Sequence, residues 1–263
     1  MRTTLLLIGA LVLAFVAAPL VIVIPMSFST AASLEFPPPG WGLGYYAAYF
    51  GDARWTRPTL NSLGIAAAVA VATLLLVTPA AFALVRHRFA GKGVVNALLM
   101  LPLMVPHIVI AIGYYAYLAD LRLLQTFPGI ILAHTALSVP VAFLVLSANL
   151  KGFDRGLERA ALSLGASPAA TFRLVTLPVL WPGFAAAGLF AFVGSFDETV
   201  VAIFISGQST ETLPRKMFDS IRSTADPVIA VVSTLLILAV TLLVAAPAIW
   251  RALSRRRRTE PAR

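Results

Sequence analysis

Residues 59–85 read TLNSLGIAAAVAVATLLLVTPAAFALV, and this stretch contains no charged side chain. About 20 apolar residues are enough for a helix to cross the roughly 30 Å hydrocarbon core of a membrane. A soluble helix of this length would keep a charged or strongly polar face toward water. The stretch therefore predicts a transmembrane helix.

The composition of the whole chain points to the same class of protein. Of its 263 residues, 59% are hydrophobic and only 12% are charged, against about 25% charged in a typical soluble domain. The mean hydropathy of +0.90 excludes a disordered chain, because disorder needs low hydrophobicity. There is no cysteine, and we find no nucleophile–base pair and no cluster of metal ligands. We therefore expect no enzyme activity, no catalytic residue, no metal and no cofactor.

Five further stretches resemble residues 59–85. Each is long enough to span a membrane, and Ala, Leu and Val dominate them; they are residues 5–26, 94–118, 130–150, 183–205 and 228–250. The short alternating segments of a membrane β-barrel are absent. We predict an all-α fold with six transmembrane helices in a single domain over residues 1–263. Residues 5–26 could also be a cleaved signal peptide, but the apolar run is long for one, so we favour an uncleaved helix.

Lys and Arg residues predict the orientation of the chain. If the N-terminus is cytoplasmic, fourteen of the twenty basic residues fall in cytoplasmic segments and six outside. Basic residues favour the cytoplasmic side, so both termini are expected in the cytoplasm. The net charge of +9 then reflects topology and not a nucleic-acid partner. The run Arg255–Arg258 is best interpreted as an anchor beside anionic headgroups.

Residues 151–182, KGFDRGLERAALSLGASPAATFRLVTLPVLWP, form the longest predicted cytoplasmic segment. Residues 154–164 have helical periodicity, and Gly165 is a typical helix terminator. Ser167 followed by Pro168 is typical of the start of a second helix, which we expect to end before Thr176-Leu177-Pro178. Two short helices at a sharp angle suit docking to a soluble partner. An amphipathic connector on the membrane surface fits the residues equally well.

The same segment resembles the EAA loop found in the permease subunits of bacterial ABC importers. The matching pattern is Glu158-Arg159-Ala160-Ala161, three residues, Gly165, nine residues, and then Val175-Thr176-Leu177-Pro178. The resemblance implies that this segment contacts an ATPase, through Glu158, Ala160, Ala161, Gly165, Ala166, Ser167 and Pro168. Arg159 stands where the family has its glutamate, and Glu158 precedes it. This shift turns the carboxylate by about 100° around the helix.

Two other stretches, Asn61-Ser62-Leu63 and Leu101-Pro102 to Pro106, also resemble these permease subunits. A later set of motifs resembles the second permease subunit of spermidine/putrescine importers; the set is Ser195-Phe196-Asp197-Glu198, Phe204-Ile205-Ser206-Gly207, Thr212-Leu213-Pro214 and Asp226-Pro227. The resemblance implies the type I ABC importer permease fold, in the bacterial inner membrane. It also implies three partners: a cytoplasmic ABC ATPase dimer, a second permease subunit expected to be a different chain, and an external solute-binding protein. The solute it implies is a polyamine such as spermidine or putrescine, and the wider set of similar permeases includes importers of other organic cations and of some opine or amino-acid-like solutes.

Asp197 and Glu198 are the two carboxylates expected within a span. A charge in the membrane is costly, so it normally faces water or a partner. These acids could line a path for a cation, with Tyr114, Tyr115 and Phe196 adding cation–π contacts. They could equally pair with a companion subunit or cap a helix break. We interpret two histidines in spans, His107 and His134, as hydrogen-bonded packing residues.

Two other classes of protein are compatible with six spans. A secondary transporter would use Asp197 or Glu198 to bind a coupling ion, and a structural membrane subunit would have no path at all. The chain has no Gly-x-x-x-x-Gly-Lys-Ser/Thr loop, so an ATP-driven transporter would need its nucleotide site on another chain.

Overall fold

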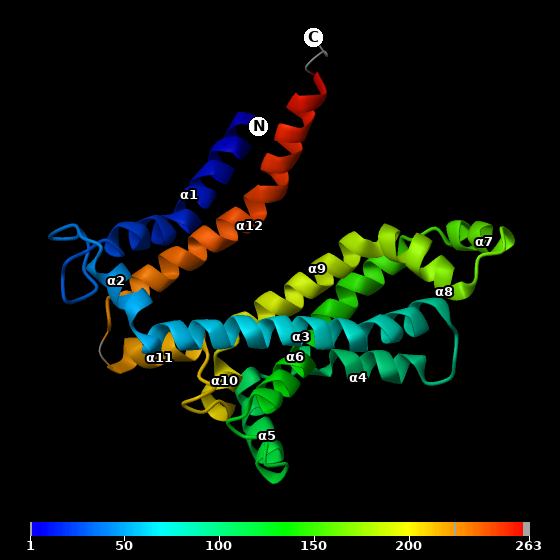
Figure 1. Ribbon diagram of the computed structural model, residues 1–263, viewed down its shortest axis with the longest axis horizontal. Coiled ribbons are helices and arrows are strands. Elements are labelled where there is room, and N and C mark those ends of the chain that lie inside the picture. Colours follow the sequence, from blue (N-terminus) through cyan, green and yellow to red (C-terminus); the bar gives the residue numbers. More distant parts are fainter. Residues whose placement is uncertain (1, 224, 260–263) are drawn as a thin grey trace. The chain divides into compact units, whose positions relative to one another are not determined.

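A computed structural model describes residues 2–223 and 225–259, and all of its named elements are helices (Figure 1). The chain forms two compact units. One consists of Met1–Thr56 and Met217–Arg263, and the other of Arg57–Lys216. The boundaries between them fall inside helices α3 (Ala53–Arg86) and α11 (Leu213–Ser223).

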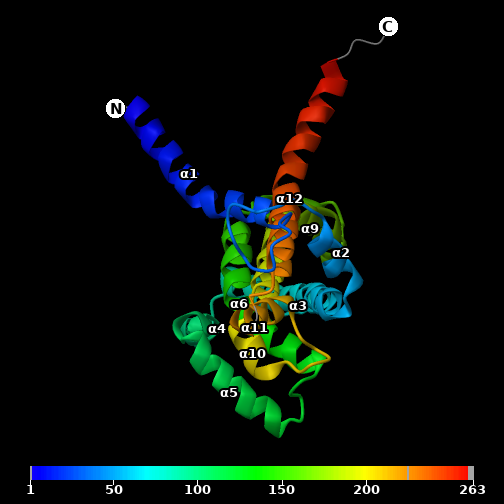
Figure 2. The same cartoon turned by 90° about the vertical axis from the view of Figure 1, so that its left-hand side faces the viewer.

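The unit that contains the terminal segments is built from α1 (Arg2–Met26), α2 (Gly44–Gly51) and α12 (Val228–Thr259). Helix α12 contacts both α1 and α2, and Figure 2 shows these helices from the side. The loop before α2 is tied to it, because the hydroxyl groups of Ser27 and Tyr46 lie 2.9 Å apart. The apolar stretch of α1 is not buried by the rest of the chain, which suits a helix surrounded by lipid or by another subunit.

The unit Arg57–Lys216 contains the other helices. They are α4 (Lys92–Met104), α5 (His107–Asp120), α6 (Phe127–Lys151), α7 (Arg155–Ser163), α8 (Pro168–Thr171), the π-helical turn η1 (Phe172–Thr176), α9 (Leu177–Phe196) and α10 (Val200–Ile205). Helices α6 and α9 make the most extensive contact and lie side by side in Figure 1. A Cβ atom on Gly183 would come within 2.7 Å of the Asn149 side chain, so glycine permits this close approach.

Helices α3 and α6 contribute to both hydrophobic cores of this unit. In the first core they meet α9, through residues such as Leu84, Leu146 and Phe184. In the second core they meet α5 and α10, through residues such as Val69 and Ile205. Both ends of the unit are therefore packed on the same two long helices.

The third predicted span, residues 94–118, is not one straight helix. Helices α4 and α5 meet at a bend of 104°. The break falls at Val105, whose ψ of 132° is extended, as expected for a residue that precedes a proline such as Pro106. The pair is either one broken span or a re-entrant loop.

The fifth predicted span, residues 183–205, differs from the structure at both ends. At its start the helix does not begin at Gly183, and the break predicted at Leu177-Pro178 is not found, because α8, η1 and α9 follow one another without interruption. The proline is instead accommodated by the π-helical turn η1, which joins α8 to α9, a common way to absorb a missing hydrogen bond. At the other end α9 stops at Phe196, and Asp197 lies in a break before α10. The two acids therefore sit between helices and not within one.

The helices that can cross a membrane account for most of the predicted spans. Within the part of the chain that the structure describes, four continuous helices are long and apolar enough to cross a membrane: Thr4–Met26, Ala53–Arg86, Phe127–Lys151 and Pro168–Phe196. The bent pair α4–α5 makes a fifth if it counts as one span. The described apolar part of α12, Val228–Leu242, is shorter. The all-α membrane fold is confirmed, and the count of six is compatible with it when α12 is the last span. The basic run Arg255–Arg258 lies outside the described side chains.

Candidate functional site

Residues 154–176, here called the elbow, connect α6 to α9 through two short helices. The Asp154 carboxylate accepts a hydrogen bond from Gly156 N at 2.7 Å and caps α7. Gly165 has a φ of +85°, a conformation that glycine adopts without strain. The Ser167 hydroxyl then accepts from Ala170 N at 3.2 Å and caps α8, with Pro168 first in the helix. The turn at Gly165 and the start of the second helix at Ser167-Pro168 are confirmed, whereas the expected end of that helix before Thr176 is wrong, because η1 joins it to α9.

The apolar side of α7 faces away from the rest of the chain. Leu157 is 45% exposed, and Leu164 at the tip of the elbow is 89% exposed. Ala160 is also exposed, while Ala161 is half-buried. The other residues expected to contact an ATPase surround this face: Gly165, Ser167 and Pro168 are exposed and Ala166 is half-buried. The elbow thus presents an apolar surface that its own chain does not cover.

Glu158 lies on a different side of α7, in the fork of a single arginine. Its two carboxylate oxygens accept hydrogen bonds from both terminal nitrogens of Arg86, each at 2.9 Å. Each side chain of the pair is 14% exposed. The Arg86 guanidinium also lies over the rings of Phe82 and Phe153, at 4.5 Å and 5.7 Å. Bidentate geometry and low exposure make this a strong contact.

A third group completes the site. The hydroxyl of the buried residue Thr176, at the end of η1, donates to Glu158 Oε1 at 2.5 Å. Glu158 therefore joins α7 to the end of α3 and to the start of α9. Burial by itself raises the pKa of the Glu158 carboxyl. The hydrogen bonds from Arg86 and Thr176 and the positive charge of Arg86 outweigh burial and hold the pKa below its ordinary value of 4.5.

The two acids expected in the membrane have different surroundings. Asp197 is exposed at the end of α9. The Glu198 carboxylate accepts from Val201 N at 2.9 Å, at the start of α10. His107 Nε2, at the start of α5, lies 3.7 Å from Glu198 Oε2. Glu198 thus lies at a helix break and faces the break between α4 and α5.

The aromatic residues expected beside the acids lie in separate places. Tyr114 packs against the second hydrophobic core, and Tyr115 is exposed on α5. Phe196 stacks on Phe192, with ring centroids 6.1 Å apart. The side chain that the structure brings to Glu198 is therefore His107 and not a tyrosine. His134 agrees with its prediction as a packing residue, because its Nδ1 lies 2.9 Å from Ser195 Oγ in the interior.

The structure also relates two motifs that the sequence could not connect. The Asn61 amide donates to the carbonyl oxygens of Ser209 and Glu211, at 3.1 Å and 2.9 Å. The Ser62 hydroxyl accepts from Leu213 N at 2.8 Å. The beginning of the second predicted span therefore holds the loop that follows α10.

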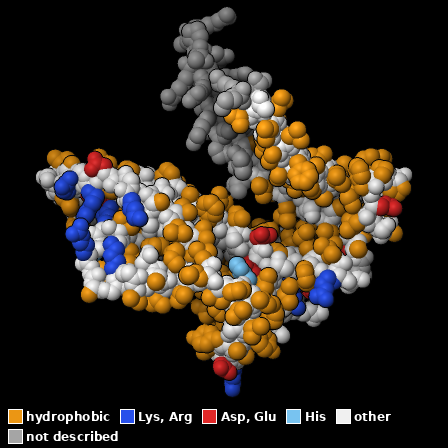
Figure 3. All heavy atoms as spheres, turned by 180° about the vertical axis from the view of Figure 1, so that it is seen from behind, with side chains coloured by type: hydrophobic (Ala, Val, Ile, Leu, Met, Phe, Trp, Pro, Cys, Tyr) orange, Lys and Arg blue, Asp and Glu red, His pale blue; other side chains and the backbone are white. Residues whose placement is uncertain are grey.

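Lys and Arg side chains gather at the elbow end of the unit Arg57–Lys216, while hydrophobic side chains cover much of the remaining visible face (Figure 3). Among the residues that the structure describes, no group of three or more His, Asp or Glu side chains could hold a metal ion.

Arg86 and Thr176 were missed by the sequence analysis. Arg86 directly follows the second predicted span, but nothing local to it identifies Glu158 as its partner.

Comparison with known families gives one match over most of the chain. The family described as binding-protein-dependent transport system inner membrane component matches residues 79–260. This range includes Arg86, the whole elbow and both acids.

Individual relatives belong to polyamine transport systems. The putrescine transport system permease protein PotI of Escherichia coli (strain K12) is 32% identical over 246 residues, covering 91% of this chain and 86% of the relative. The spermidine/putrescine transport system permease protein PotC of Haemophilus influenzae is 29% identical over 227 residues, covering 86% and 88%.

A solved structure shares the fold. A chain from the crystal structure of a bacterial ABC transporter involved in the import of the acidic polysaccharide alginate superposes with a TM-score of 0.69. The superposition covers 95% of this chain and 96% of that one, at 15% sequence identity. At this identity the likeness concerns the fold alone.

Proposed function

The chain belongs to the family of binding-protein-dependent transport system inner membrane components, and from this premise we propose that it is the permease of an ATP-driven importer for a polyamine such as putrescine or spermidine. ATP hydrolysis takes place on a separate ATPase dimer. A second permease and an external solute-binding protein complete the assembly, and both termini of the chain lie in the cytoplasm.

The observation that carries this proposal is the orientation of the two sides of α7. A connector that only packs on its own bundle would turn its apolar residues toward that bundle. Here Leu157 and Leu164 face outward, while the acid Glu158 faces the bundle. An uncovered apolar face on a rigidly attached helix is suited to a groove on a partner protein.

The attachment of the elbow explains how a partner's movement reaches the membrane helices. An ATPase that displaces α7 and α8 pulls on Glu158, and Glu158 is joined to α3 through Arg86 and to α9 through Thr176. Helices α3 and α9 share the first hydrophobic core with α6, so the three move together. Alternating access then follows as a rigid-body movement of this group.

The proposed substrate rests on the polyamine relatives and on the acids of the chain. A polyamine is a polycation at neutral pH, and a carboxylate in a site of low dielectric attracts an ammonium group strongly. Glu198 is the better placed of the two acids, because it lies between two helix breaks. We assign the neighbouring Asp197, which is exposed at the end of α9, to the same path.

The experiment compares two glycines that have the same backbone conformation. Gly165 and Gly91 both have positive φ, +85° and +83°, and a Cβ on either would meet nothing within 4 Å. Both are changed to Arg, at the same cost in backbone strain. Gly165→Arg should abolish putrescine uptake and solute-stimulated ATPase activity in the reconstituted importer, with normal membrane insertion. Gly91→Arg should retain most of both activities.

Two results would count against the proposal. Normal coupling in Gly165→Arg would show that the elbow does not dock an ATPase. Uptake that survives ATP depletion but collapses with an ionophore would indicate a secondary transporter instead.

A further inference from the structure

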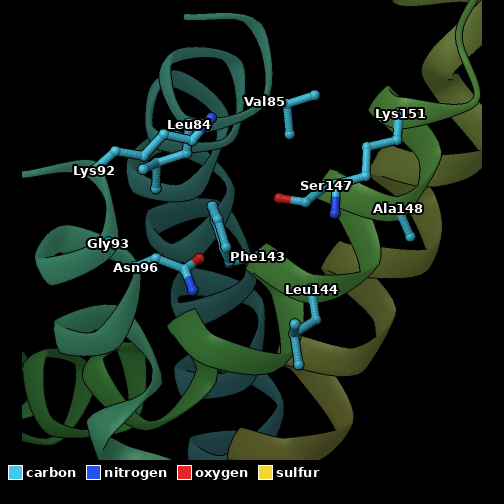
Figure 4. A pocket seen from close by; sticks show the side chains of 10 residues that line it. All are labelled: Leu84, Val85, Lys92, Gly93, Asn96, Phe143, Leu144, Ser147, Ala148 and Lys151. Atoms are coloured by element: carbon cyan, nitrogen blue, oxygen red, sulfur yellow. The ribbon is translucent and has the colours of Figure 1, made fainter. Parts of the chain in front are cut away.

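A hollow of about 610 Å³ lies between α3, α4 and α6, and it plays no part in the proposed coupling. It is found at the end of the unit Arg57–Lys216 where α6 leads into the elbow. Figure 4 shows the side chains that surround it. Lys92, at the start of α4, lies on one side, and Lys151, at the end of α6, lies on the other.

The charged groups of the hollow are both positive, and the amide of Asn96 adds a neutral donor and acceptor. The Lys92 ammonium donates to the carbonyl oxygen of His87 at 3.1 Å and keeps two protons for other acceptors. Among the described residues neither Lys92 nor Lys151 forms an ion pair with a carboxylate, and none of the described residues that line the hollow is acidic. An anion would balance this charge.

A buried hydroxyl group gives an independent indication of a ligand. Ser147 is 6% exposed, and its Oγ has no hydrogen-bond partner. Figure 4 shows the hydroxyl directed into the gap between α4 and α6, with the Lys151 side chain folded back toward it. A buried hydroxyl without a partner is costly, so an acceptor in the hollow would relieve this cost.

The rest of the wall is apolar. Phe143 and Leu84 form its buried floor, and Leu144, which is exposed, forms the rim. Because Lys92 and Lys151 stand at the ends of membrane helices, their ammonium groups lie at the depth of the lipid headgroups. Apolar walls below two cations match the shape of a phospholipid, with a phosphate at one end and hydrocarbon at the other.

We propose that this hollow binds one anionic phospholipid. Lys92 and Lys151 hold its phosphate, Ser147 donates a hydrogen bond to a phosphate oxygen, and an acyl chain runs along Leu144. The inference is independent of the proposed substrate and of the docking role of the elbow, since it uses neither.

The test is native mass spectrometry of the full chain in detergent, with phosphatidylglycerol and phosphatidylcholine of equal chain length. The wild-type chain should retain one phosphatidylglycerol in preference to phosphatidylcholine. Each lysine near a membrane surface contributes roughly a fivefold factor in affinity, so Lys92→Gln/Lys151→Gln should weaken retention about 25-fold. A second variant, Ser147→Ala, should weaken it a few-fold without changing the charge.

The control variant also removes two positive charges at this end of the unit, but at positions outside the hollow. Arg88→Gln/Arg159→Gln changes two exposed residues that do not line the hollow, and it should retain the lipid as the wild type does. The proposal is wrong if the lysine variant keeps phosphatidylglycerol or if the control loses it equally. It is also wrong if inorganic phosphate alone displaces the lipid at comparable concentration, because the site would then select a small anion.

Discussion

Removing the carboxylate of Glu158 should release the elbow from α3 and uncouple the ATPase from transport. In Glu158→Ala, Arg86 loses its bidentate partner, and its side chain is only 14% exposed in the wild type. Leaving one charge of a buried pair without its partner costs several kcal/mol, and with the remaining exposure we expect about 3 kcal/mol. This cost shifts the equilibrium between attached and released elbow by about a hundredfold.

The chain has no cysteine, so a single Cys at the exposed position Ser163 can carry a spin label at the end of α7. Glu158→Ala should make this label mobile and reduce solute-stimulated ATPase activity, while basal insertion remains normal. Thr176→Val removes one hydrogen bond to the same carboxylate and should have a smaller effect, about 1.5 kcal/mol.

Arg159→Ala is the matched control, because Arg159 is the exposed neighbour of Glu158 on the same helix. It should leave the mobility of the label unchanged. The reasoning fails if Glu158→Ala leaves the label as immobile as in the wild type, or if Arg159→Ala mobilises it equally.

Two further predictions concern charge. Because the pKa of Glu158 is lowered, its ion pair stabilises the attached elbow above pH 4.5 and is lost as the pH falls below that value. The mobility of the spin label should therefore be constant from pH 8 to 5 and rise only in more acidic solution. A rise in mobility already near pH 6 would contradict the assignment. Glu198→Gln keeps an oxygen that can cap α10 but removes the charge, so putrescine uptake should fall roughly tenfold with normal assembly. Unchanged uptake in this variant would remove Glu198 from the path.

The local structure of the elbow was predictable because its signals are local. The caps at Asp154 and Ser167 and the turn at Gly165 each depend on residues within a few positions. The membrane class was predictable for a similar reason, since hydropathy over about 20 residues decides whether a helix can lie in lipid. In both cases the controlling free energy depends on a short stretch of chain.

The tertiary structure alone decided which way each group faces and where the long helices break. Glu158 meets Arg86 across 72 positions in the sequence, and no pattern around either residue indicates the other. Prolines at Pro106 and Pro178 look alike in sequence, yet the first stands at a bend of 104° and the second in a continuous helix with a π-helical turn. Helix α9 packs on α6 more extensively than α4 does, and such packing involves neighbours that are distant along the chain and leave no mark in the local sequence.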